Sequence, residues 1–336
     1  MSSFLDFLLS LFGVKKPAPT PPPVDPSTIN NNTEPAVMTT SRVLVLVYDP
    51  TMDPATGKKL SEVQNWYRVE DLATAFMDDI RTYSGGMARY QIIQRIDIDE
   101  FPAKVDAFRY TPQSYLDVLR GVTPPHKPQE VDYASILTRF RVLERVARGE
   151  IDEVWTFGFP HAGFYESTMG GPGAFWCNSP ALRNTDASMR RFVVMGFSFE
   201  RFVGEMLEAF AHRTESTMQR AFAKLDGDAN LWSRFTRYEM VAPGKSAMGT
   251  VHYAPNSVRD YDWGNPARVK SECYDWLNNF PDFKNDVREV DASEWGGGEI
   301  RAHHRWWLNH IPRVAGRRNG IANNWWQYIL TPDKVV

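Results

Sequence analysis

The feature that most constrains this chain is an apolar strand pattern that leads directly into an amphipathic helix pattern between residues 191 and 220. Phe192–Phe199 is a largely apolar run, as expected for a buried strand. A helical pattern follows over residues 200–218, and its apolar side would pack on a core. The other side carries ionisable residues three or four positions apart, namely Glu205, Glu208, His212 and Glu215. The strand therefore leads into one helix face that carries a row of possible proton-transfer or metal-binding side chains.

Strand and helix patterns alternate through residues 41–220, which predicts an α/β fold with a layered, mostly parallel or mixed sheet. The expected strands are 42–48, 90–98, 151–159 and 192–199, and the expected helices are 69–83, 114–119, 133–148 and 200–218. The glycine-rich stretch 160–180 has no clear period, so we predict a loop without regular structure there. Residues 221–336 are rich in loops and tryptophan, and we expect them to pack on the sheet as a cap over its carboxyl edge.

The first 40 residues differ in character from the rest. Residues 1–14 carry apolar side chains at helical spacing, which predicts an amphipathic helix that anchors the protein to a membrane surface or docks on another protein. An atypical export signal is the third alternative. Residues 15–40 have the proline and polar content of an extended linker, and we expect residues 41–336 to form a single globular α/β domain. We expect a cytoplasmic or peripheral membrane protein, with export as the alternative.

Composition narrows the classes of partner. The formal net charge is -3 and the basic residues form no concentrated stripe, so we expect no nucleic-acid partner. There are two cysteines, Cys177 and Cys273, and the sequence leaves open whether they pair. No apolar run approaches the roughly 18 residues that cross a membrane.

The segment E-A-F-A-H, from Glu208 to His212, resembles the H-E-x-x-H motif of the zincin metallopeptidases. The order of strands and helices over residues 41–220 is similar to that superfamily's upper domain. The resemblance implies that Glu208 and His212 bind zinc or another divalent metal, with His252 or Glu215 as the third ligand. The zincin motif has its catalytic glutamate where this chain has Ala209.

Without a glutamate at position 209, the proton-transfer role would fall to Glu205 or Glu166. The leading hypothesis from the sequence is accordingly a metal-dependent hydrolase, or a catalytically lapsed zincin-like protein. Its ligand would be a peptide or a glycan.

Three other interpretations remain open. The polar helix face can simply be solvated surface. Alternatively, Glu166 and Glu208 can be the paired carboxylates of a glycan-binding or glycan-hydrolysing protein. Its sugar platforms would then be the tryptophan pairs Trp306, Trp307, Trp325 and Trp326. In the last interpretation the chain is a structural or interaction protein without enzymatic activity, localised by residues 1–14.

Overall fold

A five-stranded sheet organises the protein in the computed structural model, which describes residues 33–336. Its strands are β1 (Thr39–Tyr48), β4 (Ala88–Ile98), β5 (Glu153–Gly158), β6 (Ser167–Gly170) and β7 (Phe192–Ser198), in the spatial order β4-β1-β5-β7-β6. The neighbours from β4 to β7 run parallel, and β6 pairs antiparallel with β7 at the edge. This mixed, mostly parallel sheet confirms the predicted α/β fold.

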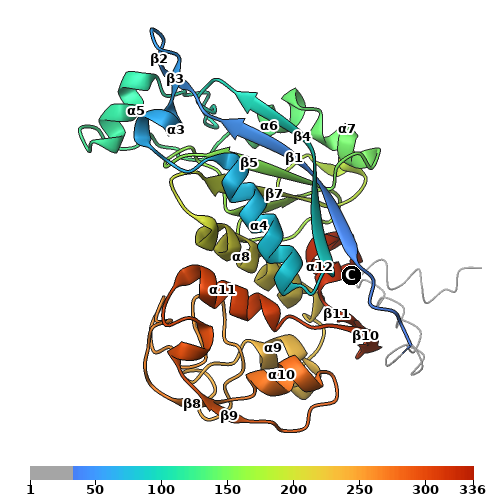
Figure 1. Ribbon diagram of the computed structural model, residues 1–336. Helices are drawn as coiled ribbons and strands as arrows, with labels where there is room; N and C mark the ends of the chain where they lie inside the picture. Colours follow the sequence, from blue (N-terminus) through green and yellow to red (C-terminus); the bar gives the residue numbers. More distant parts are fainter. Residues whose placement is uncertain (1–32) are drawn as a thin grey trace, which may run out of the picture.

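Helices cover the sheet. On the side that carries the candidate site lie α4 (Val69–Tyr83), α8 (Val203–Ala221) and the short α12 (Trp326–Leu330). On the side away from α8 lie α6 (Tyr133–Arg139) and α7 (Val142–Ala147) (Figure 1). The loops at one end hold β2 (Thr51–Asp53), β3 (Lys58–Lys59), α3 (Leu60–Gln64) and α5 (Pro112–Leu119). Since α8 directly follows β7, the sheet fixes where the helix starts.

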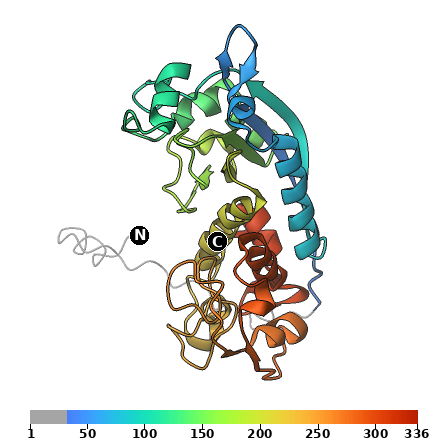
Figure 2. The same ribbon diagram turned by 60° about the vertical axis from the view of Figure 1, so that its left-hand side comes forward.

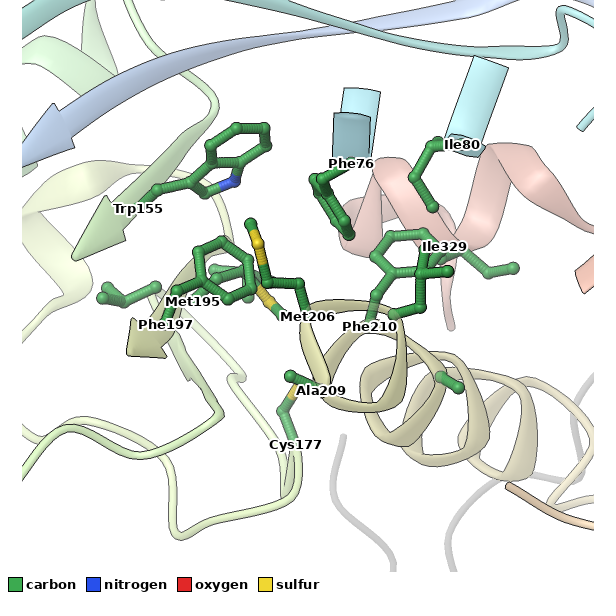
Figure 3. Packing of buried hydrophobic residues seen from close by; sticks show 14 of the residues in the cluster. Phe76, Ile80, Trp155, Cys177, Met195, Phe197, Met206, Ala209, Phe210 and Ile329 are labelled. Atoms are coloured by element: carbon green, nitrogen blue, oxygen red, sulfur yellow. The ribbon is translucent and has the colours of Figure 1, made fainter. Parts of the chain in front are cut away.

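Apolar side chains fill the space between α8 and the sheet (Figure 3). Phe76 of α4 and Phe210 of α8 are both fully buried, and their rings lie 6.0 Å apart. Phe76 also meets the edge of Trp155 from β5, at 5.3 Å between ring centres. This packing confirms the predicted apolar side of the 200–218 helix and turns its polar side away from the core.

A buried ion pair ties α8 to the centre of the sheet. Arg213 on α8 lies 2.6 Å from a carboxylate oxygen of Glu153 on β5, and both side chains are 1% exposed. Trp155 donates a hydrogen bond to the other oxygen of Glu153, and Arg213 donates one to the Ile329 carbonyl of α12. Because Arg213 directly follows His212, this pair fixes the rotation of the helix that carries the candidate site.

Residues 222–325 form a second lobe below α8, and the chain then returns to the sheet through α12 (Figures 1 and 2). Its elements are α9 (Leu231–Phe235), β8 (Val269–Ser271), α10 (Cys273–Asn279), β9 (Arg288–Val290), α11 (Ile300–Asn309), β10 (Arg313–Arg318) and β11 (Ile321–Asn324). Four 3-10 turns complete the described structure, at Asp186–Ser188, Gly227–Ala229, Ala292–Trp295 and Pro332–Lys334. α11 packs against α8 and α4, where Arg301 and Arg305 both bind the buried Asp79. The lobe thus supports the helix from the side opposite the sheet.

Two predicted elements are wrong in detail. The single helix expected at 133–148 is two helices, because Arg141 adopts a left-handed backbone with φ 53 and interrupts the hydrogen bonding. The stretch 160–180 does contain regular structure, namely β6. Its sequence, STMG, has little strand propensity of its own, and pairing with β7 creates the strand. The outer edge of β6 is covered by the following loop, in which the Leu182 backbone N–H donates to the Met169 carbonyl.

Burial also corrects the proposed sugar platforms. Trp307, Trp325 and Trp326 are at most 1% exposed, so they are core residues that no sugar can reach. Cys177 and Cys273 are both buried and free. The predicted helix at 1–14 and most of the predicted linker lie outside the described residues. Within residues 33–336, none of the helices combines the length and the apolar character that crossing a membrane requires.

Candidate metal centre

Three of the residues singled out from the sequence meet at one point of the structure. Glu208 and His212 lie one turn apart on α8, and His252 joins them from the loop between α9 and β8. His252 Nε2 lies 3.0 Å from Glu208 Oε1 and 3.1 Å from His212 Nε2. The distance from Glu208 Oε1 to His212 Nε2 is 4.0 Å. One donor atom from each residue falls within 4.8 Å of the others, so the group could hold a metal ion.

The far side of each imidazole faces a carboxylate. His252 Nδ1 lies 3.0 Å from Asp260 Oδ1, and His212 Nδ1 lies 3.3 Å from Glu215 Oε2. A carboxylate at Nδ1 favours a proton there, which leaves the Nε2 lone pair free to bind a metal. Two such lone pairs 3.1 Å apart repel each other unless a proton or a cation lies between them. The pair of histidines is therefore arranged to share a positive charge with Glu208.

Glu215 and Tyr261 support this group from its margin. The second oxygen of Glu215 accepts the Val251 backbone N–H at 2.9 Å, which links α8 to the loop that carries His252. Glu215 is not part of the three-residue group and lies behind His212, so its role as a ligand stays a prediction. Tyr261 donates to Glu208 Oε1 at 2.9 Å, and its ring lies 4.3 Å from that of His252.

The electrostatics of the group favour a bound cation. Burial raises the pKa of Glu208, but the hydrogen bonds from His252 and Tyr261 outweigh it and leave the pKa lowered. Burial lowers the pKa of His252, yet its hydrogen bond with Glu208 and the charge of Asp260 leave that pKa raised. Without a metal, a proton on His252 would supply the positive charge. A metal ion would displace this proton, so metal affinity should fall as the pH is lowered.

The candidate catalytic carboxylates line an open pocket beside the group. This pocket of about 640 Å³ is bordered by Glu208, Tyr261, Glu166 and Glu205, among others. Glu166 Oε2 lies 3.9 Å from His212 Nε2, and Asn178 donates to the same oxygen at 2.7 Å. The structure therefore brings both predicted catalytic residues to the same pocket.

Other histidines are not members of the three-residue group, although His304 lies close enough for its charge to act on Glu208. His161 lines a neighbouring cavity, with a left-handed φ of 63. His303 and His304 are fully buried and pack against Trp263. Tyr261 was missed from the sequence, where nothing distinguishes it from other tyrosines. Its left-handed φ of 56, which is visible only in the structure, marks it as a constrained position.

Comparison with known proteins adds no assignment. No family model matches the chain, and no match was found among curated proteins or among solved structures.

Proposed function

We propose that this protein is a metal-dependent hydrolase in which Glu208, His212 and His252 hold zinc or a similar divalent cation. The observation that carries the proposal is the meeting of two imidazole Nε2 atoms and a carboxylate oxygen, each histidine backed by a carboxylate at Nδ1. Two histidines and one glutamate, with a position left open, form a common donor set for catalytic zinc. The ligand spacing on α8 and the sheet that precedes it are in keeping with a zincin-like protein.

The residues around the group suit hydrolysis. A bound divalent metal would polarise the substrate carbonyl and lower the pKa of a water molecule. Ala209 cannot accept a proton, and Glu166 is our first candidate for that role because it lies 3.9 Å from a ligand atom and is oriented by Asn178. Glu205 is the second candidate. The Tyr261 hydroxyl donates its one proton to Glu208 Oε1, so its role would be to orient this ligand.

Two alternatives have less support. A glycan-directed role loses its aromatic platforms, because three of the four tryptophans are core residues. An interaction protein localised by residues 1–14 would not need the paired histidines and carboxylates described above. We therefore rank hydrolysis first, with a peptide or another carbonyl compound as the substrate.

Metal analysis of the purified protein is the first test. We expect about one zinc per chain, and its loss in Glu208→Ala, His212→Ala and His252→Ala. His161→Ala is the matched control and should retain the metal, because His161 lies outside the group. Protein that is purified without metal, binds no added zinc and unfolds at the same temperature with or without chelator would contradict the proposal.

The second test separates binding from catalysis. Glu166→Gln should keep its zinc but lose about 10²–10⁴-fold in the rate of hydrolysis of a peptide library, as expected for a general base. Stoichiometric zinc without hydrolysis of any peptide or ester in the panel would identify a lapsed enzyme that retains the metal. A Glu166→Gln variant with full activity would transfer the base role to Glu205.

A further inference from the structure

Two exposed aromatic side chains lie together in the open pocket beside the metal group. Tyr67, from the loop between α3 and α4, is 47% exposed, and Phe202, directly before α8, is 42% exposed. Their ring centres are 5.1 Å apart. Both line the pocket of about 640 Å³ that Glu208 and Tyr261 also border, and Ile300 of α11 is a third apolar residue of its wall. A ligand at the metal group therefore has two adjacent aromatic rings in the same pocket.

Neighbouring segments hold the two rings in position. The Tyr67 backbone N–H donates to the Phe199 carbonyl at 2.9 Å, which attaches its loop to the end of β7. The Arg301 guanidinium lies 5.4 Å from the centre of the Phe202 ring, and the buried Asp79 binds this guanidinium at 2.8 Å. The aromatic pair is thus a preorganised part of the pocket wall.

The stability of α8 does not explain why residue 202 is a phenylalanine. Phe202 is the N-cap residue of the helix, a position where Ser, Thr, Asp or Asn usually accepts a backbone N–H of the first turn. Its side chain makes no cap hydrogen bond and is not buried in the core. A side chain that neither caps the helix nor fills the core, and that places an apolar ring in a pocket, points to contact with a ligand.

The exposed rings favour an apolar ligand group. Single apolar side chains are common on protein surfaces, but adjacent ones in a concave pocket are typical of a binding site. A large apolar group would cover both rings and remove them from water, and an aromatic group would add the favourable geometry of ring pairs.

We propose that Tyr67 and Phe202, together with Ile300, form a specificity subsite for a large apolar side chain, with an aromatic ring preferred. In a polypeptide substrate this group is the side chain of a residue close to the cleaved bond. The word substrate rests on the proposed hydrolase function, whereas the preference for an apolar group rests on the aromatic pair.

Binding of two matched compounds tests the subsite. Nα-acetyl-phenylalanine methylamide and Nα-acetyl-alanine methylamide differ by one phenyl ring. Titration of the full-length, zinc-loaded protein, followed by NMR, should give about a tenfold lower Kd for the phenylalanine compound. High salt should leave this preference unchanged or increase it, because the contact is apolar and not ionic. Equal binding of the two compounds would overturn the proposal.

Substitutions of the aromatic pair locate the preference. Phe202→Ser removes the ring and supplies a favoured N-cap residue, so α8 should remain folded. Tyr67→Ser leaves the backbone hydrogen bond to Phe199 in place. Each variant should reduce the preference about threefold, and the double variant should abolish it. Trp176→Ser is the matched control, because it removes a ring that is 61% exposed and lies outside the pocket. A folded double variant that keeps the preference, or a Trp176→Ser variant that loses it, would refute the assignment.

His252→Ala separates the subsite from the metal-dependent function. This variant should lose zinc and still prefer the phenylalanine compound, because His252 does not line the pocket. Loss of the preference together with the zinc would overturn the subsite as an element that acts on its own. Unaltered protein that binds no zinc but still distinguishes the two compounds would support the subsite and refute only the metal-dependent function.

Discussion

Replacing Arg213 with methionine should destabilise the protein strongly, because it leaves the Glu153 carboxylate buried without its countercharge. Both side chains are 1% exposed and lie 2.6 Å apart. Trp155 would still donate to Glu153 at 2.8 Å, but a neutral donor does not replace a guanidinium. Breaking a buried ion pair on one side typically costs about 3–5 kcal/mol. That loss is a large part of the roughly 5–15 kcal/mol by which proteins are stable.

The loss should be visible as a lower midpoint of thermal unfolding. At about 2–4 °C per kcal/mol, the expected decrease is roughly 6–20 °C, toward the lower end for a chain of this size. Circular dichroism or scanning fluorimetry at neutral pH measures it. Arg220→Met, at the exposed end of the same helix, is the control and should change stability by about 0.5 kcal/mol or less.

A double variant tests whether the unpaired charge of Glu153 causes the loss of stability in Arg213→Met. Glu153→Gln together with Arg213→Met removes both charges and should recover much of the stability, because a neutral buried pair carries no desolvation penalty for ions. If Arg213→Met unfolds within a degree of the unaltered protein, the ion pair does not hold α8. If the double variant loses the sum of the two single losses, the two residues act independently and the argument fails.

Three further predictions concern the site and its surroundings. Asp260→Asn removes the carboxylate behind His252 and should weaken zinc binding about 10–100-fold in a chelator competition, and unchanged affinity would contradict a supporting role. Tyr261→Phe removes a donor to Glu208, so the pKa of Glu208 should rise and zinc binding should be lost at a higher pH than in the unaltered protein. Burial lowers the pKa of His310 to about 4, so the unfolded chain binds more protons than the folded one below about pH 6.5. His310 alone should therefore lower stability by up to about 3 kcal/mol between about pH 6.5 and 4 in urea unfolding, and His310→Phe should remove this part of the decline.

The local periodicity of the sequence is sufficient to predict most helices and strands of the sheet domain. The helix predicted at 69–83 has those bounds in the structure, and the strand that precedes α8 ends within one residue of the expected position. Helix and strand periods depend on neighbouring residues, so they can be seen without the tertiary structure. The same reasoning explains why Glu208 and His212 lie on one face, since residues four positions apart are neighbours on any α-helix.

The remaining features of the fold and of the candidate site depend on contacts between segments that are distant in the sequence. β6 exists because β7 lies beside it, and three of the four paired tryptophans are core residues because α8 and the C-terminal half of the chain pack on each other. Above all, His252 and Tyr261 reach Glu208 from a loop more than 40 positions away in the chain. No local pattern encodes the path of such a loop, because its position follows from packing and hydrogen bonds such as that between Glu215 and Val251. The sequence by itself determined the helix and the common face of Glu208 and His212. Only the tertiary structure placed His252 beside them.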